Sequence, residues 1–141
     1  MGRIINTDGA GKRRSQNMRS AAEILRRLSQ KTEIDDEVKD MVSMLVFCFR
    51  DIDESIQESA VAWEKRDYWV KAEEFRQRWS WAGDMADSLQ VIVYQEDWSR
   101  MPIMMAKLLP RVADIKITKL TRKESLWQGS YTRLLREKPP R

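Results

Sequence analysis

The side chains best suited to chemistry in this sequence are carboxylates at helical spacing. Asp51, Glu54 and Glu58 recur at intervals of three and four residues, which places them on one face of a helix. Carboxylate oxygens arranged in this way can bind Mg²⁺ and assist hydrolysis of a phosphate ester. A second acidic group follows further along the chain, comprising Glu73, Glu74, Asp84 and Asp87.

These acidic groups have a competing structural explanation. Helical carboxylates hold Mg²⁺ in all-α nucleotide pyrophosphohydrolases of the MazG type, but that family's full pattern, Glu-Glu-x-x-Glu followed by Glu-x-x-Asp, is absent here. Arg76 and Arg78 lie among the acidic residues, which favours salt bridges between helices. We therefore expect no catalytic residue, metal site or cofactor, and a Mg²⁺-dependent nucleotide hydrolase is the second alternative function.

The histidine and cysteine content excludes several kinds of catalytic and metal site. The 141 residues include no histidine and one cysteine, which excludes Cys/His zinc sites and Ser-His-Asp or Cys-His catalysis. Cys48 lies in the longest apolar run, residues 41–49, and is expected to be a small core residue. That run is too short for a membrane span, and residues 1–25 contain no apolar leader segment. We expect a cytoplasmic, non-enzymatic protein with no membrane partner.

Two stretches of hydrophobic residues mirror each other around residues 64–67. Alternating gaps of four and three residues are typical of a helix packed along a near-parallel neighbour. If the chain reverses at residues 64–67, the two stretches meet in register, with Phe49 facing Ala82 and Ile52 facing Trp79. The first stretch comprises Val38, Val42, Leu45, Phe49, Ile52, Ile56, Ser59 and Trp63, and the second Tyr68, Ala72, Phe75, Trp79, Ala82, Ala86, Leu89 and Val93.

This pattern predicts an all-α protein built on a long antiparallel hairpin, with helices at about 36–65 and 68–96. Shorter helices are expected alongside it, in a single bundle domain over residues 16–137. A flexible basic arm over 1–15 and a short tail over 138–141 complete the chain. One continuous helix of about 60 residues, paired with a second chain, is the alternative.

Shorter signals predict the remaining elements. Apolar spacing indicates a first helix over about 15–30, and Asp67 is expected to cap the third helix. Ser99 is expected to cap a fourth helix, with Pro102 in its first turn and Pro110 ending or kinking it. Ile115, Ile117 and Leu120 suggest an extended crossing. Thr121 and Glu124 match a capping box that would open a fifth helix to about Arg136.

Charge is segregated along the chain. Residues 1–31 contain eight Lys or Arg and two acidic residues, whereas residues 32–100 contain eight basic and seventeen acidic residues. Residues 101–141 contain ten basic and three acidic residues. An acidic hairpin thus separates two basic ends, which either pair with the hairpin or contact a polyanion.

The second explanation gives the leading functional hypothesis, binding of nucleic acid or a ribonucleoprotein. The basic N-terminal residues would contact phosphates, and the C-terminal cluster would combine basic residues with Trp127 stacked on a base. No recognition motif accompanies this charge pattern. The candidate residues are Lys12, Arg13, Arg14, Arg19, Arg26, Arg27, Lys116, Lys119, Arg122, Lys123 and Trp127.

The first alternative function is a protein–protein adaptor or an assembly subunit, including a homo-oligomer. Apolar residues flank the two mirrored stretches and widen the hydrophobic face beyond what two helices need. Either the shorter helices or a partner chain would cover this flank, which comprises Met41, Met44, Cys48, Trp81, Met85 and Ile92.

Overall fold

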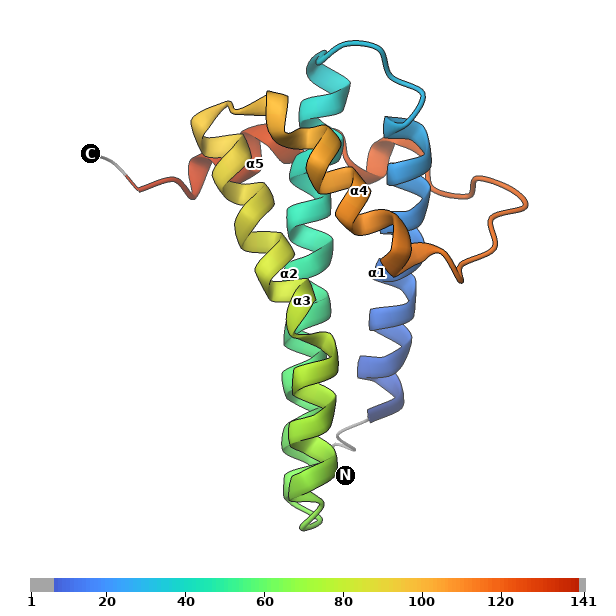
Figure 1. Ribbon diagram of the computed structural model, residues 1–141, viewed down its shortest axis with the longest axis vertical. Helices are drawn as coiled ribbons and strands as arrows, with labels where there is room; N and C mark the ends of the chain where they lie inside the picture. Colours follow the sequence, from blue (N-terminus) through green and yellow to red (C-terminus); the bar gives the residue numbers. More distant parts are fainter. Residues whose placement is uncertain (1–6, 140–141) are drawn as a thin grey trace.

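The computed structural model describes residues 7–139, with side chains from Gly9 onward, and confirms an all-α fold (Figure 1). Two single 3₁₀ turns lie between the helices: η1 before α4 and η2 before α5. The elements are α1 (Thr7–Leu28), α2 (Asp36–Glu64), α3 (Trp69–Gln95), η1 (Trp98–Arg100), α4 (Met101–Val112), η2 (Glu124–Leu126) and α5 (Ser130–Arg136).

Helices α2 and α3 form the predicted antiparallel hairpin, which extends along the long axis of the molecule (Figure 1). Phe49 and Ala82 are both buried, and the Phe49 ring meets Trp81 edge-on with centroids 5.6 Å apart. Near the reversal, Trp63 packs against Phe75 with centroids 4.7 Å apart. Aromatic pairs in this geometry stabilise a core beyond their buried area. The hairpin therefore forms within one chain, and the continuous-helix alternative is wrong.

The reversal occupies residues 65–68, one residue later than expected. Asp67 adopts the left-handed conformation, with φ of 65°. Its backbone N–H donates to the Glu64 carbonyl and that of Tyr68 donates to the Trp63 carbonyl, both at 2.9 Å, which is a Schellman motif. Asp67 thus ends α2 instead of capping α3, whose N-cap is Tyr68, so the predicted cap is wrong.

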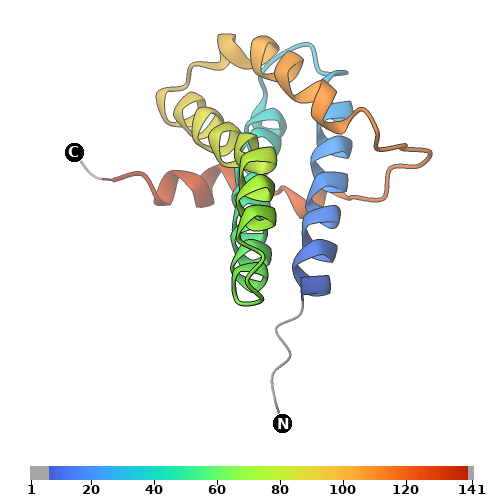
Figure 2. The same ribbon diagram turned by 60° about the horizontal axis from the view of Figure 1, so that its bottom comes forward.

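Helix α1 lies beside α2 and begins at Thr7, eight residues before the expected start (Figure 2). The part of the predicted flexible arm within the described residues, 7–15, is therefore helical, and the remainder lies outside them. Two contacts explain the longer helix. Ala10 is buried, and the Arg13 guanidinium pairs with Glu58 and, at 3.1 Å, with Asp51 of α2.

Helix α4 crosses the end of the bundle farthest from the reversal (Figure 1). Pro102 lies in its first turn as predicted, and the helix ends two residues after Pro110. The predicted cap is wrong, because the Ser99 hydroxyl bonds to the Asp97 carboxylate at 3.1 Å.

The fifth helix is shorter than predicted, because it begins at Ser130 and not at Thr121. Residues 113–123, which we call the crossing segment, run beside α1 without forming a helix. Thr121 and Glu124 therefore do not open α5, because Thr121 bonds to Glu23 of α1 instead. Gly129, at φ of 81°, separates η2 from α5.

The wide apolar flank of the hairpin faces the interior of the protein. Met41, Cys48, Met85 and Ile92 are buried, whereas Met44 and Trp81 are partly buried. Side chains from α1, α4 and α5, including Leu25, Leu108 and Leu134, belong to the same core. The bundle itself therefore covers most of the flank, as the first of the two sequence-based options required, and leaves Trp81 partly exposed.

Candidate nucleic-acid interface

Of the carboxylates that first suggested metal chemistry, Asp51 and Glu58 bind α1, while Glu54, Glu74, Asp84 and Asp87 are exposed. Asp51 accepts a hydrogen bond from Asn17 at 2.7 Å and also pairs with Arg13 of α1, as does Glu58. Within the described residues, no three His, Cys, Asp or Glu side chains converge to hold a metal ion. Salt bridges between helices were expected here, with Arg76 and Arg78 as the partners. The observed partner of Asp51 and Glu58 is instead Arg13 of α1.

The basic residues at the start of α1 separate into different roles. Lys12 is exposed, and Arg13 is paired with the α2 carboxylates. Arg14 turns toward α3, with its guanidinium carbon 4.9 Å from the Phe75 ring centroid and 5.7 Å from that of Trp79. It also donates a hydrogen bond to the Ser55 hydroxyl at 3.2 Å. Burial, and secondarily Arg13, lowers the pKa of Arg14.

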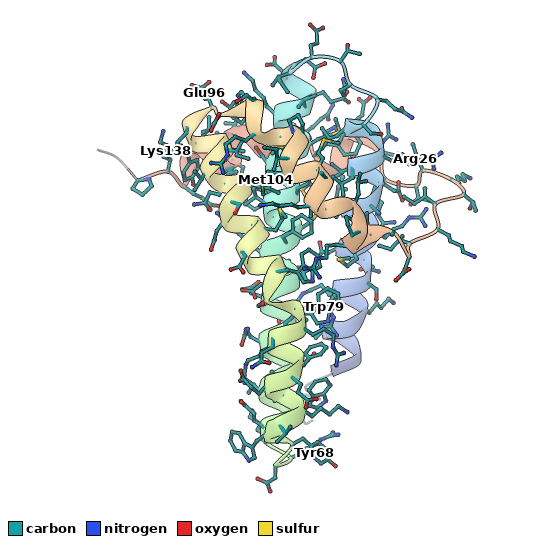
Figure 3. The ribbon with its side chains drawn as sticks, viewed as in Figure 1. Arg26, Tyr68, Trp79, Glu96, Met104 and Lys138 are labelled. Atoms are coloured by element: carbon teal, nitrogen blue, oxygen red, sulfur yellow. The ribbon has the colours of Figure 1, made fainter. Side chains whose placement is uncertain are left out.

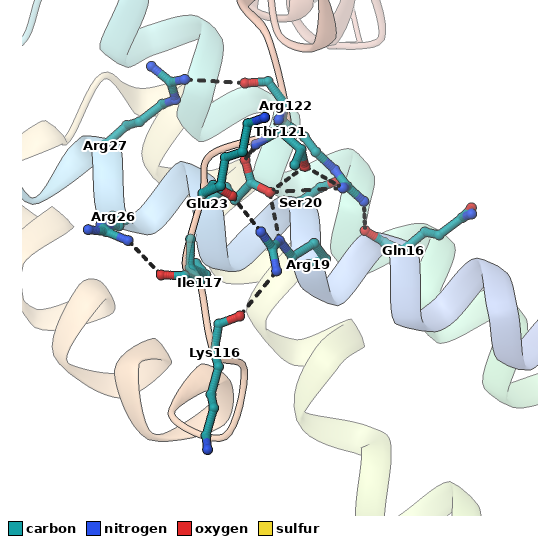
Figure 4. Close-up of polar contacts among 11 residues, drawn as sticks. Gln16, Arg19, Ser20, Glu23, Arg26, Arg27, Lys116, Ile117, Thr121 and Arg122 are labelled. Carbon is teal, nitrogen blue, oxygen red and sulfur yellow. Dashed lines mark hydrogen bonds and ion pairs between the residues drawn. The ribbon is translucent and has the colours of Figure 1, made fainter.

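Three further arginines of α1 bind the backbone of the crossing segment (Figure 4). Arg19 donates to the carbonyls of Lys116 at 3.2 Å and Lys119 at 2.7 Å. Arg26 donates to the Ile117 carbonyl at 3.0 Å. Arg27 donates to the Arg122 carbonyl at 3.2 Å. These guanidinium groups therefore help to fix the position of a segment that has no regular secondary structure of its own.

Glu23 is the centre of this network and is fully buried. Its carboxylate accepts hydrogen bonds from the Arg122 backbone N–H at 2.8 Å, the Arg19 guanidinium at 2.7 Å, and both the backbone N–H and the hydroxyl of Thr121. Burial acts to raise the pKa of Glu23, but the donors outweigh it and lower the pKa to about 2. Four donors to a charged acceptor are what a buried carboxylate requires.

The predicted C-terminal basic cluster is therefore only partly available to a ligand. Lys116, Lys119 and Lys123 are exposed. Arg122 instead donates to Ser20 at 3.0 Å and to the Gln16 carbonyl at 3.0 Å.

Trp127 must be removed from the predicted interface. Only 1% of its surface is exposed, and the Arg27 guanidinium lies 5.1 Å from its ring centroid. Because the indole is part of the core, it cannot stack on a base. Charged residues surround Trp127 along the chain, so the sequence allowed either an exposed ring or packing against the bundle, and the structure shows the second.

The structure assembles a different basic site between α1, α3 and α4. Four arginines and two tryptophans line a groove of about 560 Å³, which we call the Arg–Trp groove. One carboxylate, that of Asp114, also lines it. Figure 3 shows Trp79 between the hairpin and α1. The groove is lined by Arg14, Ser15, Met18, Arg19, Arg78, Trp79, Trp81, Pro110, Arg111, Asp114 and Ile115.

In this groove two tryptophan rings stack on each other, and a guanidinium group lies over each of them. The rings of Trp79 and Trp81 are stacked, with centroids 5.8 Å apart and planes inclined by 27°. Arg14 lies over Trp79, and the Arg111 guanidinium carbon lies 4.9 Å from the Trp81 centroid. Cation–π contacts hold guanidinium groups in place without neutralising their charge. Two arginines are therefore held at the groove by uncharged partners.

Sequence reasoning identified Arg14 and Arg19 in this groove but missed Arg78, Trp81 and Arg111. The run Arg78-Trp79-Ser80-Trp81 carried a usable signal, because tryptophans close to an arginine can stack on bases beside a phosphate contact. Trp79 was assigned to the hairpin packing surface instead. Nothing local indicated Arg111, which reaches the groove only because α4 crosses the bundle.

Comparison with protein-family models, with curated proteins and with solved structures found no match for this chain. No helix in the described part of the chain is both long enough and apolar enough to cross a bilayer.

Proposed function

We propose that this protein is a non-enzymatic, cytoplasmic nucleic-acid-binding protein whose ligand occupies the Arg–Trp groove. One observation carries the proposal: Arg14, Arg78 and Arg111 line the same groove as the stacked Trp79 and Trp81. A ribonucleoprotein remains a suitable partner, because its RNA would present the same groups.

The groove contains the two kinds of contact that nucleic acid needs. A guanidinium group donates a planar fork of hydrogen bonds that matches a phosphate, and each neutralised phosphate releases counterions. Indole rings offer apolar surface to bases. Since Arg19 already binds Glu23, the charge offered to a ligand comes mainly from Arg14, Arg78 and Arg111.

The groove suits a single strand better than a duplex. A duplex stacks its bases inside and presents a broad surface of phosphates, whereas a single strand can turn its bases toward aromatic side chains. A recess of about 560 Å³ between three helices is too small for a duplex. Exposed Lys12, Lys116 and Lys119 would add long-range attraction for the strand outside the groove.

The test is titration of labelled single-stranded RNA and DNA oligonucleotides, followed by fluorescence anisotropy at 50 and 200 mM salt. We expect the double variant Arg78→Ala/Arg111→Ala to weaken binding at least tenfold and to reduce its dependence on salt. The matched control, Arg133→Ala/Arg136→Ala, removes two exposed arginines of α5 and should change affinity less than twofold. Failure of the unaltered protein to bind at 50 mM salt, or equal losses in both variants, would contradict the proposal.

An adaptor function retains one specific observation, although its expected surface is buried. Ile103 and Leu109 on α4 are both more than half exposed. Exposed aliphatic side chains on one short helix suit contact with another protein. Replacing both with lysine should abolish such a complex without affecting oligonucleotide binding, and pull-down after nuclease treatment would detect the loss.

A further inference from the structure

Large exposed apolar side chains gather at the hairpin tip, which we define as residues 61–71. Trp69 is 60% exposed and Val70 is 73% exposed. Tyr68 and Val61 beside them are also exposed. Half of the large hydrophobic residues that are exposed in the described chain lie in this short region. Single exposed hydrophobic residues are common on protein surfaces, but a cluster at one end of the molecule requires an explanation.

Packing within the chain does not explain the cluster. The Schellman motif at Asp67 satisfies the backbone of the turn, and a fork of two hydrogen bonds from Arg76 to Glu64, of 2.6 and 3.1 Å, fastens α3 to the end of α2. Trp63 supplies the aromatic contact on the inner side, against Phe75. The fold is thus closed at this end without the side chains of Trp69 and Val70.

Basic residues surround the exposed apolar group. Lys65 and Arg66 precede it, Lys71 follows it, and all three are exposed. Asp67 is the one acidic residue between 65 and 71. On either side of that range, Glu64 is paired with Arg76, and Glu73 and Glu74 lie exposed in the next turn of α3. The hairpin tip therefore combines aromatic, aliphatic and cationic side chains, although the hairpin as a whole is acidic.

The shape of the molecule makes the hairpin tip accessible. Helix α2 has 29 residues and is ~43 Å long. Its far end projects beyond α1, while α4 and α5 lie at the opposite end (Figure 1). In Figure 3, Tyr68 lies at the extreme end of the molecule. A flat surface could meet the hairpin tip without touching α4 or α5.

We propose that the hairpin tip binds the surface of an anionic lipid bilayer. Tryptophan and tyrosine favour the level of the lipid headgroups, where their rings are in apolar surroundings and their polar atoms remain hydrated. Val70 enters beside them, while Lys65, Arg66 and Lys71 contact lipid phosphates. A shallow hollow of about 520 Å³ lies among residues 67–71, and the aromatic and cationic side chains around it favour lipid headgroups as the occupant.

This contact is peripheral, so it is compatible with the absence of a membrane-spanning helix from the described residues. The sequence-based expectation of no membrane partner considered only spanning segments. The inference is also independent of the proposed nucleic-acid site, because the hairpin tip and the Arg–Trp groove share no residue.

The test is co-sedimentation of the full chain with vesicles of phosphatidylcholine alone and with 30% phosphatidylserine. We expect binding to the anionic vesicles and at least a fivefold loss in Trp69→Ser/Val70→Ser. A comparable loss is expected in Lys65→Gln/Arg66→Gln. The matched control, Ile103→Ser/Leu109→Ser, removes a similar exposed apolar area from α4 and should bind as the unaltered protein does. Circular dichroism and thermal melting would establish that each variant folds.

Three outcomes would overturn the proposal. The first is no binding of the unaltered protein to anionic vesicles. The second is an equal loss in the α4 control. The third is a dimer, detected by light scattering without lipid, that dissociates in the Trp69→Ser/Val70→Ser variant, since a second copy would then cover the hairpin tip. Oligonucleotide binding should be unchanged in all hairpin-tip variants, which keeps this result separate from the test of the groove.

Discussion

The carboxylate of Glu23 accepts hydrogen bonds from both the backbone N–H and the hydroxyl of Thr121, at 2.7 and 2.8 Å. The two residues are 98 positions apart in the chain. This contact fixes the crossing segment to α1, and the crossing segment connects α4 with the C-terminal core residues Trp127 and Leu134. This buried carboxylate, together with the arginines of α1, thus fixes the crossing segment on the bundle.

Replacing Glu23 with glutamine should destabilise the protein by about 3 kcal/mol, because the donors around it would lose a charged acceptor and one would face an amide NH₂ group. Urea unfolding monitored by circular dichroism would measure the change. Trypsin should also cleave the released crossing segment at Lys116 and Lys119 more quickly. Glu54→Gln, which makes the same chemical change at an exposed position of α2, should alter the free energy of unfolding by less than about 0.5 kcal/mol.

The same carboxylate predicts a defined response to acid. The pKa of Glu23 is about 2 in the folded state and should be near 4.3 in the unfolded chain, so its contribution to stability is complete above pH ~4.5. That contribution, about 3 kcal/mol, should disappear as the pH falls toward 2. Urea unfolding between pH 6 and pH 2 should show the unaltered protein losing more stability than Glu23→Gln. Parallel curves for the two proteins would contradict the assignment.

Two glycines should respond in opposite ways to substitution by alanine. Gly129 has φ of 81°, so Gly129→Ala should destabilise the protein by about 1 kcal/mol even though no atom lies within 4 Å of the new methyl group. Gly11 lies within α1, and its nearest neighbour would be the Arg14 guanidinium at 3.7 Å. Gly11→Ala should therefore stabilise the protein by about 0.5–1 kcal/mol through helix propensity. Thermal melting of the two variants provides the comparison.

Cys48 should be unreactive in the folded protein. Burial, and secondarily Asp51, raises the pKa of its thiol to about 12, so almost no thiolate is present at pH 8. Ellman's reagent should label the native protein only at the rate of unfolding and label it at once in concentrated urea. Rapid labelling under native conditions would show that the surroundings of Cys48 open without global unfolding.

The hairpin could be predicted because the sequence pattern that specifies it, the spacing of apolar residues, is local and repeats along both helices. The alternating spacing of apolar residues along α2 and α3 specifies which face of each helix is buried, and a reversal between two such helices needs only a few residues. Phe49, Ile52 and Ala82 are buried as that pattern requires. The apolar flank was equally informative, since more hydrophobic surface than two helices can bury implied additional helices.

The predicted helix ends failed where a side chain found a better partner far along the chain. Thr121 and Glu124 have the spacing of a capping box, yet the Thr121 hydroxyl bonds to Glu23. Capping preferences of about 1 kcal/mol cannot compete with hydrogen bonds to a buried carboxylate. Similarly, pairing of Arg13 with Asp51 and Glu58 extends α1 into residues expected to be flexible.

The candidate site shows the same division between local and long-range information. The sequence alone established an all-α hairpin, its buried faces and an excess of positive charge at both ends, because periodicity and composition are properties of neighbouring residues. Only the tertiary structure decided which cations are available to a ligand. The Arg19 guanidinium binds Glu23 and that of Arg122 binds Ser20 and the Gln16 carbonyl. Arg14 and Arg111 instead lie over the stacked rings of Trp79 and Trp81. A guanidinium group binds whichever acceptor or aromatic face the fold brings near it, and that choice depends on helices distant in the sequence.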